Sequence, residues 1–134
     1  MIDAPRDPSD GNSRMRVLVV DDQVDCVLSI GRLLEVLGYR VRVALDGLGA
    51  LACAAEFRPR VALLDLSLPH LDGFAVAERL RAMPETRDAY LIAMTGWGTD
   101  DVRARVEAGA FDRHLVKPLS ADTLTGVLDM VRHA

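Results

Sequence analysis

Cysteine, histidine and aromatic residues are scarce in this sequence of 134 residues, which contains two cysteines, three histidines and 4% aromatic residues. Cys26 and Cys53 form no CxxC pair and have no metal-type spacing. His70, His114 and His133 form no ligand cluster, so neither a zinc site nor a Ser-His-Asp catalytic order is indicated. Both cysteines fall among apolar residues in helical patterns, and we expect buried, unreactive thiols.

Long apolar runs and basic stripes are also missing. No stretch approaches the roughly 20 apolar residues that cross a membrane, and the N-terminus lacks a signal-peptide core, so we expect a cytoplasmic protein without membrane contact. The net charge is −4 and the arginines are scattered over expected helix faces, which argues against direct binding of nucleic acid. The sequence contains no GxxxxGK[ST] motif, so a nucleoside triphosphate is not expected as the direct ligand.

The length and composition are those of one soluble globular domain, with 50% hydrophobic and 27% charged residues. Residues 1–14 contain proline, aspartate, serine, glycine and asparagine, with almost nothing to bury. We expect this segment to be a flexible leader, followed by a single domain at 15–134.

Short apolar segments alternate with segments of helical periodicity along the rest of the chain. A run such as residues 61–64 is typical of a strand buried on both faces. Alternating strands and helices joined by short loops form βαβ units with right-handed crossovers, which predicts a doubly wound α/β fold with a parallel sheet. The expected strands are 15–20, 41–44, 61–64, 89–94 and 114–116, and the expected helices are 24–37, 47–57, 73–82, 100–107 and 121–131.

Capping residues and apolar spacing refine these helices. Asp46, Thr99 and Ser120 stand where helix N-caps are expected. The helix after Thr99 has a thin apolar face, formed by Val102 and Val106, so we expect it to be the least firmly docked. The inner faces of the first, second and last helices are predicted to be Val24, Val27, Leu28, Gly31, Leu34 and Leu37; Leu48, Leu51, Ala52 and Ala55; and Leu124, Val127, Leu128 and Val131.

Polar residues follow four of the five expected strands. Asp21 and Asp22 follow the first strand, and Asp65 follows the third. Thr95 and Lys117 follow the fourth and fifth strands. The carboxyl ends of parallel strands lie at one edge of a sheet, where open α/β folds bind their ligands. We therefore expect these five side chains to form one site.

The residue types of this site indicate its chemistry. Clustered carboxylates repel one another unless a cation binds among them, and ligands that are all oxygen favour Mg2+ over zinc. A hydroxyl and an ammonium at the same edge suit a phosphoryl group. One carboxylate would then be the nucleophile, which gives an aspartyl phosphate.

These motifs together resemble those of response-regulator receiver domains, the CheY-like family of two-component signalling. The resemblance runs from about residue 15 to residue 131 and implies a five-stranded parallel sheet of order 2-1-3-4-5. It rests on Val-Val-Asp-Asp at 19–22, Leu-Leu-Asp-Leu-Ser-Leu-Pro at 63–69, Asp-Gly at 72–73, Met-Thr-Gly at 94–96 and Lys-Pro at 117–118.

The resemblance implies roles for the acidic residues. Asp65 corresponds to the phosphoacceptor, which takes a phosphoryl group from the phosphohistidine of a histidine kinase or a histidine phosphotransfer protein. Asp22 corresponds to a direct Mg2+ ligand and Asp21 to an acid that holds the ion through water. Asp65 and the backbone carbonyl of Ser67 would complete the protein ligands.

It also implies roles at the ends of the last two strands. Thr95 corresponds to the hydroxyl that moves toward the phosphoryl group, and Lys117 to the ammonium that pairs with it. The peptide bond before Pro118 is expected to be cis, a geometry almost confined to X–Pro bonds.

Three positions depart from the family pattern. His114 stands where many receivers have the aromatic switch residue, and we raise the hypothesis that its charge makes the switch sensitive to pH. Trp97, two residues after Thr95, could obstruct the hydrolytic water and prolong the life of the phosphoryl group. Ser67 replaces a frequent asparagine. The local sequence around Lys117 is similar to that of receivers attached to hybrid sensor kinases.

We therefore expect a phosphoacceptor switch that acts through an unknown downstream protein, as a single-domain regulator or a relay, and that is a monomer or a weak homodimer. It is expected to catalyse its own phosphotransfer and autodephosphorylation without being a conventional enzyme. The alternative is a Mg2+-dependent phosphohydrolase with an aspartyl nucleophile, but such enzymes usually carry a second carboxylate where this chain has Ser67. A binding module that works without phosphorylation has little need of Thr95 and Lys117.

Overall fold

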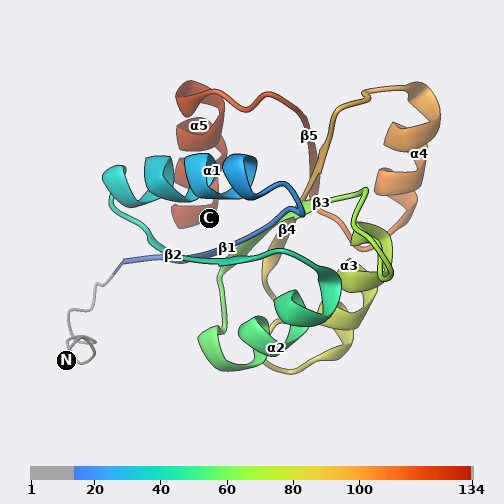
Figure 1. The fold of residues 1–134 in the computed structure, drawn as a ribbon, viewed down its shortest axis with the longest axis horizontal. Helices are drawn as coiled ribbons and strands as arrows, with labels where there is room; N and C mark the ends of the chain where they lie inside the picture. Colours follow the sequence, from blue (N-terminus) through green and yellow to red (C-terminus); the bar gives the residue numbers. More distant parts are fainter. Residues whose placement is uncertain (1–13, 134) are drawn as a thin grey trace.

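The fold consists of five strands that alternate with five helices (Figure 1). The computed structural model describes residues 14–133, so the expected leader at 1–14 lies outside the described residues except for Arg14. The strands are β1 (Arg16–Val20), β2 (Arg40–Ala44), β3 (Val61–Asp65), β4 (Tyr90–Thr95) and β5 (Arg113–Val116), and the helices are α1 (Val24–Val36), α2 (Gly47–Phe57), α3 (Gly73–Ala82), α4 (Asp100–Ala108) and α5 (Ala121–Arg132).

The strands form one parallel sheet in the order β2-β1-β3-β4-β5, which confirms the predicted topology. β3 lies in the centre and all five of its residues are buried, as its unbroken apolar run predicts. The register aligns the last residues of neighbouring strands: Val20 pairs with Leu64, Asp65 with Met94, and Thr95 with Val116. This register brings the polar residues that follow the strands to one edge of the sheet.

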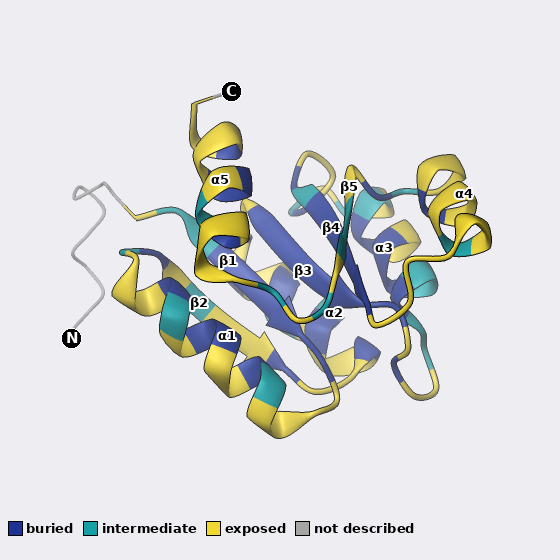
Figure 2. Ribbon diagram, turned by 90° about the horizontal axis from the view of Figure 1, so that it is seen from above, coloured by how far each residue is buried: buried dark blue, intermediate teal, exposed yellow. Residues whose placement is uncertain are grey.

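Helices cover both faces of the sheet (Figures 1 and 2). α1 and α5 pack on one face around Val19, Leu63 and Ile92. α2, α3 and α4 pack on the other face around Leu18, Leu64 and Leu91. α4 contributes one buried residue, Val106, so its attachment is as thin as the sequence predicts.

Side-chain caps define where four helices begin. Asp46, Thr99 and Ser120 accept hydrogen bonds from backbone N–H groups in the first turns of α2, α4 and α5, as predicted. Asp72 caps α3 in the same way, through the N–H of Ala75 at 2.9 Å. α1 has no side-chain cap, but Asp21 accepts from the N–H of Gln23 at its start. This hydrogen bond links Asp21, at the carboxyl end of β1, directly to the start of α1.

The predicted inner faces of α1 and α2 are partly wrong. On α1, Val24 and Leu28 are exposed and Ile30 is buried, and Leu37, which follows the end of the helix, is exposed as well. On α2, Leu48, Ala52 and Ala55 are exposed and Leu51 is half-buried, and the buried residues are Gly47, Ala50, Ala54 and Phe57. Nearly every position of α2 is apolar, so its spacing does not select one face. Close packing determines which face of α2 is buried. At Gly47 the helix approaches the backbone of Leu71 so closely that a Cβ would lie 2.7 Å from the Leu71 carbonyl oxygen.

Among the described residues, no helix combines the length and apolar character that a bilayer span requires.

The predicted apolar stripe of α5 is confirmed, since Leu124, Val127, Leu128 and Val131 are all buried.

Candidate functional site

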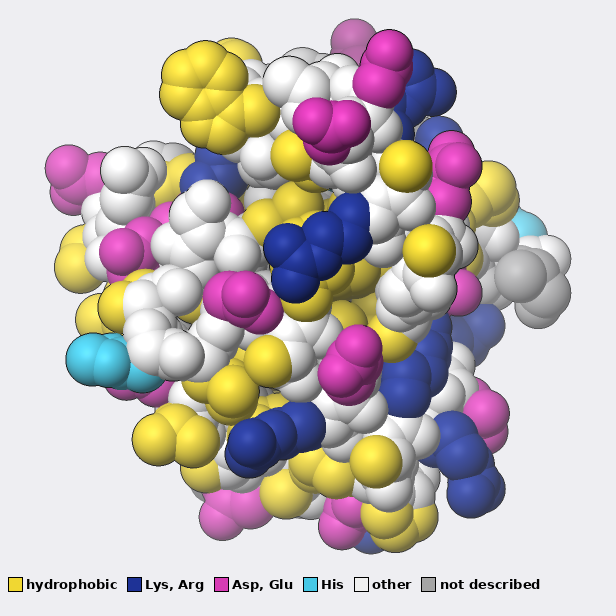
Figure 3. All heavy atoms as spheres, turned by 90° about the vertical axis from the view of Figure 1, so that its right-hand side faces the viewer, with side chains coloured by type: hydrophobic (Ala, Val, Ile, Leu, Met, Phe, Trp, Pro, Cys, Tyr) yellow, Lys and Arg dark blue, Asp and Glu magenta, His cyan; other side chains and the backbone are white. Residues whose placement is uncertain are grey.

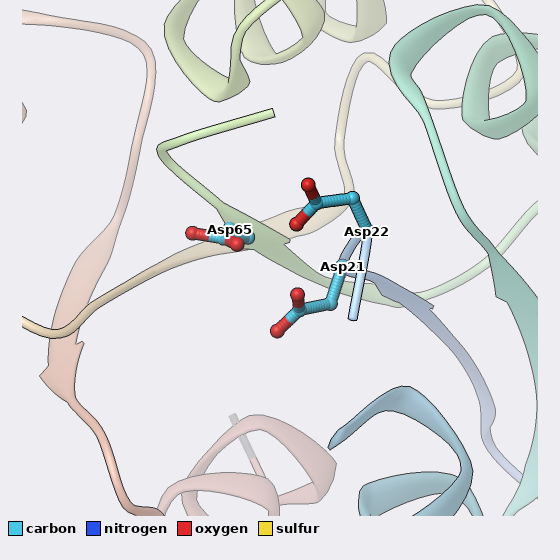
Figure 4. Close-up of side chains that lie close together, drawn as sticks. All are labelled: Asp21, Asp22 and Asp65. Carbon is cyan, nitrogen blue, oxygen red and sulfur yellow. The ribbon is translucent and has the colours of Figure 1, made fainter. Parts of the chain in front are cut away.

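Three carboxylates meet at the carboxyl ends of β1 and β3 (Figure 4). Asp21 and Asp22 follow β1, and Asp65 is the last residue of β3. One carboxylate oxygen from each residue lies within 4.8 Å of the others. Asp21 is fully buried, Asp65 is 6% exposed and Asp22 is exposed. The cluster therefore has two buried members and one that faces solvent.

Lys117 brings a positive charge to this cluster from the end of β5. Its Nζ donates to Oδ2 of Asp21 at 2.6 Å and lies 3.4 Å from Oδ2 of Asp65. The peptide bond between Lys117 and Pro118 is cis, as the resemblance implies. The ammonium is thus shared by the two buried carboxylates, with the shorter contact to Asp21.

The protonation of these groups follows from burial and their partners. Burial alone would raise the pKa of Asp21, but hydrogen bonds from Lys117 and from the N–H of Gln23 hold this pKa below its usual value. Burial raises the pKa of Asp65, helped by the charge of Asp21 and opposed by the N–H of Ser67. Burial opposes the charge of Lys117, but the two carboxylates outweigh it and raise its pKa. Lys117 therefore stays charged at neutral pH.

Thr95 ends β4 beside this cluster. It is 4% exposed, and its Oγ1 accepts a hydrogen bond from the N–H of Trp97 at 3.1 Å. Its backbone carbonyl accepts from the N–H of Lys117 at 2.8 Å. The loop that leads to α4 and the segment that carries Lys117 are therefore both hydrogen-bonded to Thr95.

Comparison with known proteins identifies the family. The family model described as the response regulator receiver domain matches residues 17–129, which is most of the chain. The chain belongs to the response regulator receiver-domain family. Receiver domains are phosphoaccepting signalling domains of two-component systems, not conventional enzymes.

Individual relatives of this receiver domain agree with that assignment. The chain is 44% identical over 108 residues to the transcriptional regulatory protein PrrA of Mycobacterium leprae, covering 81% of this chain and 46% of PrrA. It therefore spans about half the length of that relative. Because PrrA is named a transcriptional regulator, our expectation of no contact with nucleic acid stays a prediction.

The receiver fold also matches solved structures. The chemotaxis protein CheY4 of Vibrio cholerae superposes with a TM-score of 0.84 at 28% identity, covering 89% of this chain and 99% of CheY4. The receiver domain of sensor histidine kinase PA1611 of Pseudomonas aeruginosa has a TM-score of 0.83 at 28% identity, covering 91% of this chain and all of that domain. The latter structure holds a magnesium ion in its active-site cleft. The predicted similarity to receivers of sensor kinases is thereby supported.

The acidic cluster of this receiver is chemically suited to a hard divalent cation. Its three candidate ligands are all carboxylates, and no cysteine or histidine is among them. Lys117 offsets part of the negative charge of the two buried members, while Asp22 lies open to solvent, where an ion can enter. The residues present therefore fit a metal ion bound by oxygen ligands.

Gly73 allows α3 to begin directly against β3. A Cβ on Gly73 would collide with the backbone carbonyl oxygen of Asp65 and lie 2.8 Å from Cα of Leu66. The N–H of Gly73 also donates to the carbonyl of Leu66 at 3.2 Å. The Asp-Gly pair at 72–73 thus caps α3 and admits its close approach to the backbone of Asp65.

Cys26 was not predicted to lie near the site. Burial and the neighbouring Asp21 carboxylate raise the pKa of its thiol to about 11, so the thiol is neutral at pH 7. Both Cys26 and Cys53 are half-buried, so the prediction that they are buried is wrong. The position of Cys26 in the first turn of α1 carries no motif that could reveal its contact with Asp21 from the sequence.

His114 lies on β5, away from the acidic cluster. Its Nε2 is buried and has no hydrogen-bond partner among the described residues. Burial, and then the positive charge of Arg103 on α4, lower the pKa of His114. The surroundings of this residue therefore oppose its protonation, and the hypothesis of a pH-sensitive switch stays a prediction.

This lowered pKa predicts a pH dependence of stability. The unfolded chain takes up the His114 proton at a higher pH than the folded chain, so the stabilising effect is complete above the ordinary histidine pKa and is lost as pH falls through it. Urea unfolding at pH 7.5 and pH 5.5 should therefore show a larger loss for the wild type than for His114→Phe. Equal losses in the two proteins would contradict this account.

Proposed function

We propose that Asp65 is the residue that receives the phosphoryl group, from the phosphohistidine of a histidine kinase or a histidine phosphotransfer protein. The observation that carries this proposal is the environment of its carboxylate. Oδ1 accepts from the N–H of Ser67 at 3.1 Å, and Oδ2 faces the ammonium of Lys117 at 3.4 Å. The side chain is thus oriented at the edge of the sheet, beside the one cation that the site residues supply.

In this transfer, a carboxylate oxygen of Asp65 attacks phosphorus and the phosphorus–nitrogen bond breaks. The bonding electron pair returns to the imidazole nitrogen of the donor, and Asp65 becomes an acyl phosphate. Lys117 is placed to pair with the new phosphoryl oxygens, because its ammonium already lies 3.4 Å from Oδ2 of the accepting carboxylate. Positioning and charge neutralisation supply most of the catalysis in such transfers.

We further propose that the cation is Mg2+, held by Asp21, Asp22, Asp65 and the backbone carbonyl of Ser67. When bound, Mg2+ neutralises charge on the transferring group. Asp22, which is exposed, and Asp21, which accepts a hydrogen bond from Lys117, would each supply a carboxylate to the ion. The magnesium ion in the related PA1611 receiver supports this choice.

The output of the switch is proposed to run through Thr95 and α4. The Thr95 hydroxyl would turn from the N–H of Trp97 toward the phosphoryl group, which would loosen the segment before α4. α4 is held by few buried contacts and is suited to a two-state element. The domain would then signal, in the cytoplasm, to a downstream protein rather than to nucleic acid or membrane, as a monomer or weak homodimer, and reset by autodephosphorylation.

Trp97 is predicted to slow that reset. Its side chain is 73% exposed beside Thr95, where it can screen the phosphoryl group from water. Trp97→Ala should accelerate loss of the phosphoryl group by up to about 10-fold, or about 1.4 kcal/mol of barrier. The decay of the phosphorylated form, followed by mass, measures this rate. Leu48→Ala, which removes an exposed apolar side chain of α2, is the control, and an unchanged decay in Trp97→Ala would exclude the effect.

Intact mass after incubation with Mg2+ and acetyl phosphate tests the proposed acceptor. The wild type should gain one phosphoryl group, and chelation of Mg2+ should suppress the gain. Asp65→Ala should gain none, whereas Asp122→Asn, which changes an exposed carboxylate in the first turn of α5, should behave as the wild type. An adduct that persists in Asp65→Ala, or no wild-type adduct even with phosphohistidine donors, would overturn the proposal.

A further inference from the structure

β2 is an edge strand whose backbone is open on one side. Within residues 14–133 its one neighbour in the sheet is β1. The N–H of Arg40 donates to Met15 at 3.0 Å, and the carbonyl of Ala44 accepts from Asp21 at 3.2 Å, so these residues face β1. Backbone groups alternate along a strand, so Val41 and Val43 turn theirs to the open edge. An open edge of this kind can pair with another extended chain.

One side of this edge offers apolar side chains. A groove of about 690 Å³ runs between α1 and β2, and Leu28, Val41 and Val43 line it together with Gly31 and the polar or charged residues Asp25, Ser29, Arg32, Glu35 and Arg42. A Cβ on Gly31 would lie 3.3 Å from Val43, so the glycine keeps the floor of the groove close to the helix backbone. Leu28 and Val43, on neighbouring elements, are 56% and 40% exposed. The groove can therefore receive apolar side chains.

The other side of the same edge is cationic. A hollow of about 560 Å³ is lined by Arg16, Arg40, Arg42 and Arg58, with Phe57 and Glu56. Both Arg40 and Arg42 lie over the ring of Phe57, with their guanidinium carbons 5.8 and 5.1 Å from its centre. The ring attracts both cations and so holds two like charges side by side.

These arginines have spare binding capacity. None of the four forms an ion pair within 4.0 Å with a carboxylate of the described residues. A guanidinium binds a carboxylate through two parallel hydrogen bonds, so the hollow suits acidic side chains. Elsewhere, on the side that bears α3 and α4, acidic, basic and apolar side chains are interspersed (Figure 3). Glu56 also lines the hollow, so four arginines stand beside one carboxylate and the hollow carries an excess of positive charge.

We propose that the β2 edge docks an extended segment of a partner protein in which apolar and acidic residues alternate. Side chains of a strand point alternately to opposite faces, so such a segment places its apolar residues in the α1 groove and its acidic residues in the arginine hollow. Its backbone pairs with Val41 and Val43. This surface lies outside the acidic site and does not depend on the proposed function.

Other occupants fit less well. A second copy pairing through β2 brings the arginines of the two strands together, and like charges across a strand pair are destabilising. The phosphates of a nucleic acid could pair with the arginines, but a nucleic acid would leave the apolar side chains of the groove and the open strand edge without partners. The net charge of −4 also opposes nucleic-acid binding.

Fluorescence anisotropy with a labelled peptide of about ten alternating valine and glutamate residues, a typical strand length or slightly more, tests the proposal. Arg40→Glu/Arg42→Glu should weaken binding by at least about tenfold. Arg79→Glu, which reverses an exposed charge on α3, should bind within about twofold of the wild type, because that charge lies on another element. Circular dichroism confirms that each variant is folded.

Changes in the peptide provide a test that does not depend on the variants. N-methylation of the valines removes the backbone donors and should abolish binding. Alternating valine and lysine should also fail to bind. The proposal is overturned if no binding is seen at millimolar peptide, if N-methylation has no effect, or if a DNA oligonucleotide or inorganic triphosphate competes as well as the peptide, since these outcomes leave no role for strand pairing.

Discussion

Lys117→Met is expected to lower the free energy of unfolding by about 3 kcal/mol, the scale of loss when one partner of a buried ion pair is removed. Asp21 is fully buried and receives the Lys117 ammonium at 2.6 Å. Methionine keeps most of the length of the lysine stem but leaves the Asp21 carboxylate without its cation, beside a second buried carboxylate, Asp65. Urea unfolding at pH 7 without divalent cations measures the loss.

A double variant separates this electrostatic effect from lost packing. Lys117→Met/Asp21→Asn removes both charges, so it should recover more than half of the stability that Lys117→Met loses. Arg79→Met, which removes an exposed cation from α3, should cost little. If the single and double variants were equally destabilised, the loss would come from the lysine stem and not from the unpaired carboxylate.

The fold could be predicted because its strands differ sharply from its helices in pattern. β3 is an unbroken apolar run, and α5 has one clear stripe. α2 shows the limit of this approach. Its positions are almost all apolar, and its orientation depends on where Gly47 meets Leu71, a contact between segments far apart in the sequence. Spacing alone cannot report such a contact.

The site was predictable for a related reason. Parallel strands place their carboxyl ends together, so residues that follow them converge whatever their distance in the sequence. The sequence could not show how charges divide within the cluster. Lys117 lies closer to Asp21 than to Asp65. Nor could it show that arginines from two strands, β1 and β2, and from the end of α2 gather around Phe57. These details depend on side-chain directions.

Asp22→Ala is expected to weaken Mg2+ binding by about 100-fold, at the upper end of the losses seen when support for a metal site is removed, with little change in stability. Asp22 is exposed, so its loss disturbs no core packing, while it removes one of three carboxylates that converge within 4.8 Å. Isothermal titration calorimetry with MgCl2 measures the affinity, and Asp25→Ala, which removes an exposed carboxylate from the first turn of α1, is the matched control. If both variants bound Mg2+ like the wild type, Asp22 would not be a ligand, and the ion would have to depend on the two buried carboxylates that Lys117 already partly neutralises. If the affinity for Mg2+ fell in Asp22→Ala but not in Asp25→Ala, the solvent-facing carboxylate of Asp22 would be shown to supply negative charge that Lys117 does not neutralise.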